Sequence, residues 1–94
     1  MYQICNTLDI DYDKVTEYAL FDQRIGRSHL AVPGPDGDFG YGGHCFPKDL
    51  DAMIYLMLKN EVDSEMLRAT RAKNNSVRQN RDWEAMSGRA VSKE

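Results

Sequence analysis

Residues 47–60 read PKDLDAMIYLMLKN, and their apolar side chains recur every three or four positions. That spacing puts them on one face of an α-helix, which should pack toward a core. Proline is tolerated in the first turn of a helix, where its missing N–H costs nothing, and Pro47 occupies that place. Asn60 is expected to end the helix. The apolar face consists of Leu50, Met53, Ile54, Met57 and Leu58.

Two helical segments are expected on the N-terminal side of this stretch. Residues 1–7 look like the end of a helix. Asp11 is of a residue type that caps helices, and Ile10 before it can pack on Val15 as a hydrophobic staple. The sequence therefore predicts a helix from Asp11 to about Asp22.

A long helix is expected on the C-terminal side. Asp63 or Ser64 can cap it, and it is predicted to run to about Met86, with Gly88 as the stop signal. Its apolar residues are few, which is typical of a helix that bridges parts of a protein or packs on another chain. No alternating apolar run predicts a strand, so the fold class expected is all-α. Residues 1–86 are assigned to one domain and residues 87–94 to a linker-like tail.

The connection between Gln23 and Cys45 has neither helical nor strand periodicity. It contains two of the three prolines and most of the glycines, and a loop this long in so small a domain is usually functional or disordered. Phe39, Tyr41 and Phe46 argue against disorder, because aromatic side chains need a surface on which to pack. A long, glycine-rich functional loop is therefore expected.

Composition limits the classes of function. Acidic residues outnumber basic ones by 15 to 12 among the 94 residues, which argues against a general nucleic-acid binder. No apolar run is long enough to span a bilayer, and no signal peptide is recognisable. The two cysteines, in unrelated contexts, do not indicate a disulfide framework. A cytoplasmic protein with no membrane and no nucleic-acid partner is the expectation.

Basic residues of the C-terminal third alternate with acidic ones. That pattern favours a solvated helix face over a phosphate site. The triplet Asn74-Asn75-Ser76 is likewise interpreted as helix surface. The basic residues are Arg68, Arg71, Lys73, Arg78, Arg81, Arg89 and Lys93.

The most informative segment is GYGGHCFPKD, residues 40–49. Cys45 directly precedes the predicted helix, whose unpaired N–H groups and dipole favour the thiolate form of a thiol. Lys48 adds positive charge, and Asp49 lies about one helical turn further on, where it can hold or activate a water near the sulfur. These residue types in this order suggest a cysteine nucleophile with its helpers.

Each of these residues also has a structural interpretation. A lone cysteine is more often a small buried hydrophobic residue than a nucleophile, and Lys48 and Asp49 can be ordinary surface charges. A metal site is disfavoured, since Cys5, His29 and His44 lack the spacing of paired ligands. The glycines also lack the spacing of a dinucleotide-binding turn, and no strand precedes them.

GYGGHCFPKD closely resembles the active-site motif of the UDP-glucose/GDP-mannose dehydrogenase family. Arg24-Ile25-Gly26 is similar to an element that precedes the same loop in that family. Residues 1–15 resemble the stretch after a helix of its central domain, and residues 68–78 resemble its long central helix. The resemblance thus covers nearly the whole chain and implies the central domain.

This resemblance implies oxidation of a primary alcohol of a nucleotide sugar to a carboxylate, in two hydride transfers to NAD and through a cysteine thioester. It makes Cys45 the nucleophile, Asp49 the residue that assists the water, and Lys48 a neighbour of the nicotinamide end of NAD. The loop from Asp36 to Gly43 would wrap the substrate, and Arg24 would reach the substrate of a neighbouring subunit. The implied substrate-binding residues are Arg24, Asp36, Phe39, Gly40, Tyr41, Gly42 and Gly43.

The resemblance also sets expectations about the rest of the enzyme. The family's Rossmann domain, its uridine-binding domain, and a lysine and asparagine that precede this region have no counterpart in the 94 residues. A fragment is therefore expected that is inactive and does not bind NAD alone, forms a homodimer, and could work with a separate Rossmann-domain chain. UDP-glucose is the leading substrate, with GDP-mannose or an N-acetylhexosamine nucleotide left open. A non-catalytic dimerisation or interaction module is the alternative from another class.

Overall fold

The computed structural model describes residues 1–85, which form four α-helices and a short 3-10 helix and contain no strand. The prediction of an all-α fold is confirmed over this part of the chain. The helices are α1 (Tyr2–Thr7), α2 (Tyr12–Ala19), α3 (Cys45–Lys59), α4 (Glu65–Val77) and the 3-10 helix η1 (Asp82–Ala85).

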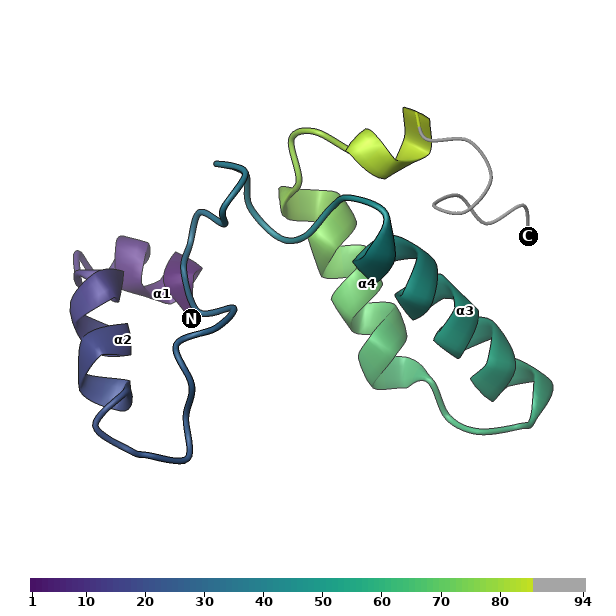
Figure 1. Cartoon of the computed structure of the whole chain (residues 1–94), viewed down its shortest axis with the longest axis horizontal. Coiled ribbons are helices and arrows are strands. Elements are labelled where there is room, and N and C mark those ends of the chain that lie inside the picture. The colour runs from purple at the N-terminus through teal and green to yellow at the C-terminus, as the bar shows by residue number, and fades with distance from the viewer. Residues whose placement is uncertain (86–94) are drawn as a thin grey trace.

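The helices are arranged in two pairs (Figure 1). The short helices α1 and α2 pack together near the N-terminus, whereas α3 and α4 lie side by side as an antiparallel pair. Residues 20–44 connect the pairs without helix or strand. Lys73 Nζ of α4 donates to Gln3 Oε1 of α1 at 2.6 Å and so links the two pairs, whereas the Tyr12 hydroxyl of α2 donates to the carbonyl oxygen of Leu30 in the connection at 2.6 Å.

Local capping explains where two helices begin. The Asp11 side chain accepts a hydrogen bond from the backbone N–H of Asp13 at 3.0 Å, as predicted, although α2 ends at Ala19 rather than near Asp22. The Asp63 carboxylate accepts from the N–H of Glu65 at 2.9 Å, directly before α4. Each aspartate satisfies an N–H group that has no partner inside its helix.

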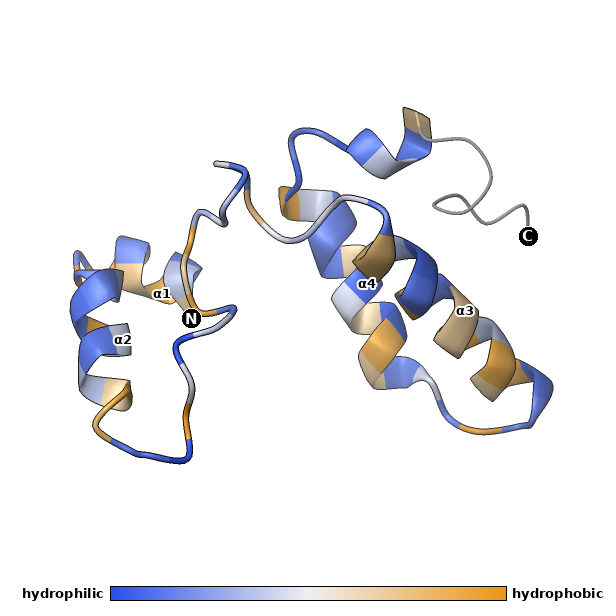
Figure 2. Ribbon diagram, in the orientation of Figure 1, coloured by the Kyte–Doolittle hydropathy of each residue, from blue (hydrophilic) through white to orange (hydrophobic). Residues whose placement is uncertain are grey.

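The apolar face of α3 is only partly buried. Ile54 is 2 % exposed and packs at the centre of the helix pair, and Leu50 and Met57 are half-buried. The prediction was wrong for Met53 and Leu58, which are 47 % and 56 % exposed. Among residues 1–85 only α4 packs extensively on α3, so one side of its apolar surface is left uncovered (Figure 2).

The long C-terminal helix was predicted too far. Helix α4 ends at Val77, and Arg78 is extended, with ψ of 127°. The reason lies in the loop before α3: the Asp38 carboxylate accepts hydrogen bonds from the N–H groups of Gln79, at 3.2 Å, and Asn80, at 2.7 Å. In a continuing helix those groups would instead donate to carbonyls one turn earlier. Met86, Gly88 and the expected tail at 87–94 lie outside the described residues.

Candidate functional site

The loop that leads into α3 is attached to α4 through Asn74. The Asn74 side chain is only 4 % exposed. Its Oδ1 accepts from the backbone N–H of Tyr41 at 2.7 Å, and its Nδ2 donates to the carbonyl oxygen of Tyr41 at 3.0 Å. One amide thus satisfies both backbone groups of one loop residue. The interpretation of Asn74 as helix surface was therefore wrong.

Arg78 makes the second attachment, directly after α4. Its side chain is 1 % exposed, and its Nη2 lies 2.6 Å from Asp36 Oδ2 and 3.5 Å from Asp82 Oδ1. Its Nη1 donates to the carbonyl oxygen of Phe39 at 3.3 Å. A third carboxylate, that of Asp38, lies 3.5 Å from Nε. The expectation that the basic residues of this region form a solvated face is wrong for Arg78, since three carboxylates surround it.

These contacts change the acidity of the groups involved. A hydrogen bond from Arg78 holds the pKa of Asp36 below its ordinary value. Burial pushes the pKa of Asp38 upward, but three backbone N–H groups and the charge of Arg78 lower it overall. Burial pushes the pKa of Arg78 downward, and the surrounding carboxylates raise it overall. All three groups are therefore held in their charged forms.

Two glycines of the motif are explained by close approach of these side chains. Gly40 has φ of +67°, and a Cβ there would collide with the Asn74 amide. A Cβ on Gly42 would collide with the guanidinium of Arg78 and with the Asp82 carboxylate. Only glycine lets the loop backbone pass this close to α4 and the segment after it.

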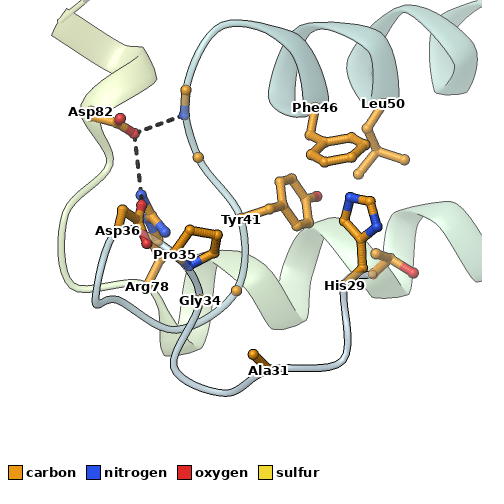
Figure 3. Close-up of a pocket in the computed structure, with 14 residues that line it drawn as sticks. His29, Ala31, Gly34, Pro35, Asp36, Tyr41, Phe46, Leu50, Arg78 and Asp82 are labelled. Carbon is orange, nitrogen blue, oxygen red and sulfur yellow. Dashed lines mark hydrogen bonds and ion pairs between the residues drawn. The ribbon is translucent and has the colours of Figure 1, made fainter. Parts of the chain in front are cut away.

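The last attachment comes immediately before the helix. The backbone N–H of Gly43 donates to Asp82 Oδ1 at 3.1 Å, so Asp82 contacts both Arg78 and the loop (Figure 3). His44 follows as the N-cap of α3, and Cys45 is its first residue. The position of Cys45 is thus connected to α4 and η1 through a short run of backbone.

A cleft of about 720 Å³ lies beside this loop. The rings of His29 and Tyr41 both meet Phe46 edge-on, with ring centres 5.7 Å and 6.0 Å from it, and Arg78 lies at the opposite end between two carboxylates (Figure 3). Burial, followed by the charge of Asp51, raises the pKa of Tyr41. The lining residues are His29, Ala31, Gly34, Pro35, Asp36, Gly40, Tyr41, Gly42, Gly43, Phe46, Leu50, Thr70, Arg78 and Asp82.

The three residues singled out for chemistry lie on the first turn of α3. Cys45 is exposed, and Lys48 Nζ pairs with Asp49 Oδ1 at 3.2 Å. None of the three lines the cleft, whereas Phe46 and Leu50 do. Because successive residues turn about 100° around a helix, Cys45 and Asp49 share a face adjacent to the one that faces the cleft.

The predicted substrate-binding residues do not all come together. Asp36, Gly40, Tyr41, Gly42 and Gly43 line the cleft. Phe39 instead packs against Tyr2, with ring centres 5.8 Å apart. Arg24 is exposed and is held by Asp22 in a two-point ion pair, with N–O distances of 3.1 Å and 2.8 Å.

Sequence reasoning missed Asn74, Arg78 and Asp82 as partners of the motif. A signal was present in the sequence, since Asn74, Arg78 and Asp82 are spaced four apart, as on one helix face. The spacing does not indicate, however, which loop these three side chains contact.

No metal site is formed by His, Cys, Asp and Glu side chains within residues 1–85. Over the same residues no helix is both long and apolar enough to cross a membrane.

The sequence and its relatives identify the family. Residues 1–76 match the model for the central domain of the UDP-glucose/GDP-mannose dehydrogenase family. The chain is 38 % identical over 74 residues to UDP-glucose 6-dehydrogenase of Pseudomonas aeruginosa, covering 79 % of this chain and 15 % of that enzyme. It is 33 % identical over 78 residues to UDP-glucose 6-dehydrogenase of Rickettsia prowazekii, covering 83 % of this chain and 17 % of that enzyme.

A third relative, UDP-glucose 6-dehydrogenase of Bacillus subtilis, is 34 % identical over 73 residues, covering 78 % of this chain and 16 % of that enzyme. No solved structure matches the chain. The chain spans about one sixth of the length of these relatives, and the matched part includes the whole motif at residues 40–49. On this evidence the chain belongs to the UDP-glucose/GDP-mannose dehydrogenase family.

Proposed function

We propose that this chain provides the nucleophile and the substrate loop of a UDP-glucose 6-dehydrogenase. The observation that carries the proposal is the exposed thiol of Cys45 at the first residue of α3, at the end of a loop held by Asn74 and Asp82. Relatives named UDP-glucose 6-dehydrogenase match the stretch that contains this motif. An exposed thiol can attack a substrate carbon, and cysteine is both a good nucleophile and a good leaving group.

The chemistry assigned to Cys45 begins at the aldehyde stage of C6. The sulfur attacks C6, a C–S bond forms, and the adduct loses a hydride to become a thioester. When bound in the complete enzyme, NAD would supply the hydride acceptor for both oxidations, with Lys48 as the residue of this chain that would lie beside it. Water then attacks the thioester carbon, the C–S bond breaks, and the carboxylate leaves while the thiol is restored.

Asp49 is assigned to the hydrolysis step. It lies one turn from Cys45 on the same face of α3, and its side chain is exposed to water. A carboxylate there can accept a proton from the attacking water. Lys48 Nζ pairs with Asp49 Oδ1 at 3.2 Å, which places a positive charge beside that carboxylate on the first turn of α3.

The loop is assigned to the substrate. Five of its residues, Asp36, Gly40, Tyr41, Gly42 and Gly43, line the cleft, and the three glycines expose backbone groups that suit contacts with a sugar and its phosphates. The Asp36 carboxylate is paired with Arg78, so its part in substrate binding is indirect. Arg24 is far more exposed than its partner Asp22, and we assign it to the substrate of a neighbouring subunit in a homodimer.

The described residues do not form a complete NAD site. Residues 1–85 contain no strand, so they lack the strand–turn–helix unit that holds a dinucleotide pyrophosphate. Lys48 is the one contact to NAD that we assign here. We therefore expect the 94-residue chain alone to show neither NAD binding nor dehydrogenase activity, because a few contacts do not offset the freedom that the cofactor loses.

The proposal is tested by grafting residues 1–85, which include Arg78 and Asp82, into the Pseudomonas aeruginosa enzyme in place of the corresponding segment. The graft should form NADH from UDP-glucose. Cys45→Ala should abolish that activity, whereas Cys5→Ala should retain it. GDP-mannose is assayed in parallel to identify the nucleotide sugar.

Two outcomes would contradict the proposal. One is a graft that binds NAD and has the helix content of the parent, yet oxidises no nucleotide sugar, which is the result expected of a non-catalytic interaction module. The other is full activity in the Cys45→Ala graft.

A further inference from the structure

The loop residues before Cys45 have few side chains of their own with which to stabilise one backbone conformation. Residues 40–43 read GYGG, and Gly40 and Gly43 have φ of +67° and +81°. Three of the four residues have no side chain with which to pack, and glycine has more accessible backbone conformations than any other residue. The conformation of this segment must therefore be set by groups outside it.

Those groups come from α4 and from the residues that follow it. Asn74 binds both backbone polar groups of Tyr41. Asp82 accepts from the N–H of Gly43, and Arg78 holds Asp82 from the other side. The fixed points are thus residues 41 and 43 of the loop, and the second lies two residues before Cys45.

The side chains of Asn74 and Arg78 have donor and acceptor groups that match the loop atoms they bind. A primary amide carries a donor and an acceptor side by side, which is what the N–H and C=O of one residue require. An arginine presents its donors in a rigid fork, so it can contact Asp36, Asp82 and the carbonyl oxygen of Phe39 at once.

General stabilisation does not explain this choice. A buried ion pair often contributes no more to stability than apolar residues of the same volume would. Arg78 is nevertheless the one charged residue that is buried among residues 1–85, and it lies where an apolar side chain would leave the loop carboxylates without their cation. The arrangement therefore favours a geometric role.

We propose that Asn74 and Arg78 are positioning residues for Cys45: through Tyr41 and through Asp82 and Gly43 they fix the backbone that leads into the first turn of α3. Neither touches the sulfur, so neither is a catalytic residue. This inference rests on the proposed function for its catalytic meaning, whereas the positioning itself can be measured on the chain alone.

The first experiment measures amide hydrogen exchange by NMR in the 94-residue chain. Asn74→Leu removes both hydrogen bonds, and Asn74→Asp removes the donor while nearly preserving shape. Arg78→Lys keeps the charge and loses the fork. Asn75→Asp, an exposed neighbour on the same helix, is the matched control.

We expect the Tyr41 amide to exchange about tenfold faster in Asn74→Leu, the factor that corresponds to one hydrogen bond of typical net strength. Asn74→Asp keeps the acceptor of that bond but places a carboxylate oxygen against the Tyr41 carbonyl oxygen, so its effect should be seen in the positions of the loop signals. The amide of Gly43 should exchange faster in Arg78→Lys. The amide signals of residues 41–45 should shift in all three variants. Signals of α1 and α2 should be unchanged, and Asn75→Asp should resemble the parent chain.

Two results would overturn the inference. Unchanged exchange at Tyr41 in Asn74→Leu and at Gly43 in Arg78→Lys, or unshifted signals of residues 41–45 in Asn74→Asp, in chains that keep their helices would show that the contacts do not hold the loop. An equal loss of protection in all four helices would show a role in general stability instead. If Asn74→Leu fails to fold, Asn74→Asp and Arg78→Lys still decide between these results.

The second experiment introduces Asn74→Asp into the graft. Misplacement of a reacting group by about 1 Å can reduce a rate on the order of 10²-fold, so kcat should fall steeply, and by a larger factor than the KM for UDP-glucose rises through the displaced loop. An unchanged kcat would show that the loop contact of Asn74 does not matter for catalysis by Cys45. An inactive parent graft would count against the proposed function alone, because the exchange measurement does not depend on activity.

Discussion

At the scale of single residues, the two cysteines differ mainly in access. Cys45 is exposed at the start of α3, and Cys5 is buried within α1. We expect iodoacetamide to alkylate Cys45 well before Cys5 in the folded chain, since a buried thiol reacts only when the structure opens. Peptide mass spectrometry over time gives both rates. In urea the two rates should converge, and equal rates without urea would contradict the placement of the two thiols.

Gly42 provides a second residue-scale test. A Cβ there would meet Arg78 and Asp82, and Arg78 cannot easily move because it is buried and held by carboxylates. We expect Gly42→Ala to lower the free energy of unfolding by about 1–3 kcal/mol, the usual effect of overpacking.

The matched control is Gly26→Ala. No atom lies within 4 Å of a Cβ at Gly26, and its φ is not in the left-handed region. That variant should be as stable as the parent chain or slightly more stable, because alanine restricts the unfolded chain. Urea denaturation followed by circular dichroism measures both variants. Equal stability of the two would show that the loop does not pass as close to Arg78 as described.

The candidate site was predictable from the sequence only where its signals are local. The order of Cys45, Lys48 and Asp49 predicts that they lie at the start of a helix, and all three lie in the first turns of α3. Asn74 and Arg78 meet residues 33 and 42 positions away along the chain. Charge alternation and helix periodicity describe neighbours only, so they favoured a solvated surface for two buried side chains.

At the scale of elements, Arg78 and its carboxylates connect the loop to the segment after α4, and that connection should depend on pH. The pKa values of Asp36 and Asp38 are lowered in the folded chain. A lowered folded pKa gives stability that is complete above the unfolded pKa, roughly 3.9 for aspartate, and is lost as the pH falls through the folded value. The loop should therefore detach from Arg78 in acid below about pH 4.

Trp83 can report that detachment. It is the one tryptophan of the chain, it is buried, and the Arg78 guanidinium lies 5.9 Å from the centre of its ring. Its fluorescence should change during acid titration, and the change should be shallower in Asp36→Asn, which no longer titrates at that position. Glu17→Gln, on exposed α2, is the control and should titrate like the parent. A signal that stays constant down to the acid unfolding of the helices would contradict the prediction.

The end of α3 was predicted correctly at Asn60, which is its C-cap, whereas α2 and α4 were predicted better at their starts than at their ends. Asp11 and Asp63 act within their own segments, so local sequence locates the beginnings of α2 and α4. The end of α4 is fixed by Asp38 in the loop before α3. The two N–H groups that this carboxylate binds lie 41 and 42 positions further along the chain. No pattern within the helix itself contains that information.

At the scale of the whole molecule, the described residues leave much apolar surface uncovered. The uncovered apolar residues of α3 are Met53, Tyr55, Leu56 and Leu58, and Met66 of α4 is also exposed. Exposed apolar surface of this kind marks an interaction site more often than a solvated face. A homodimer is the occupant that we propose, in keeping with the assignment of Arg24 to a neighbouring subunit.

The dimer can be tested on the 94-residue chain. A two-fold symmetric dimer places the same patch of both copies against one another, so one substitution changes the interface twice. We expect sedimentation equilibrium at high micromolar concentration to show a dimer, and Leu56→Glu to weaken it by at least about tenfold, because a charge buried without a partner is strongly unfavourable. Tyr18→Glu, an equally exposed apolar-to-acidic change on α2, should leave the dimer intact. A parent chain that stays monomeric throughout, or an equal effect of both variants, would mean that α3 is covered by something other than a second copy.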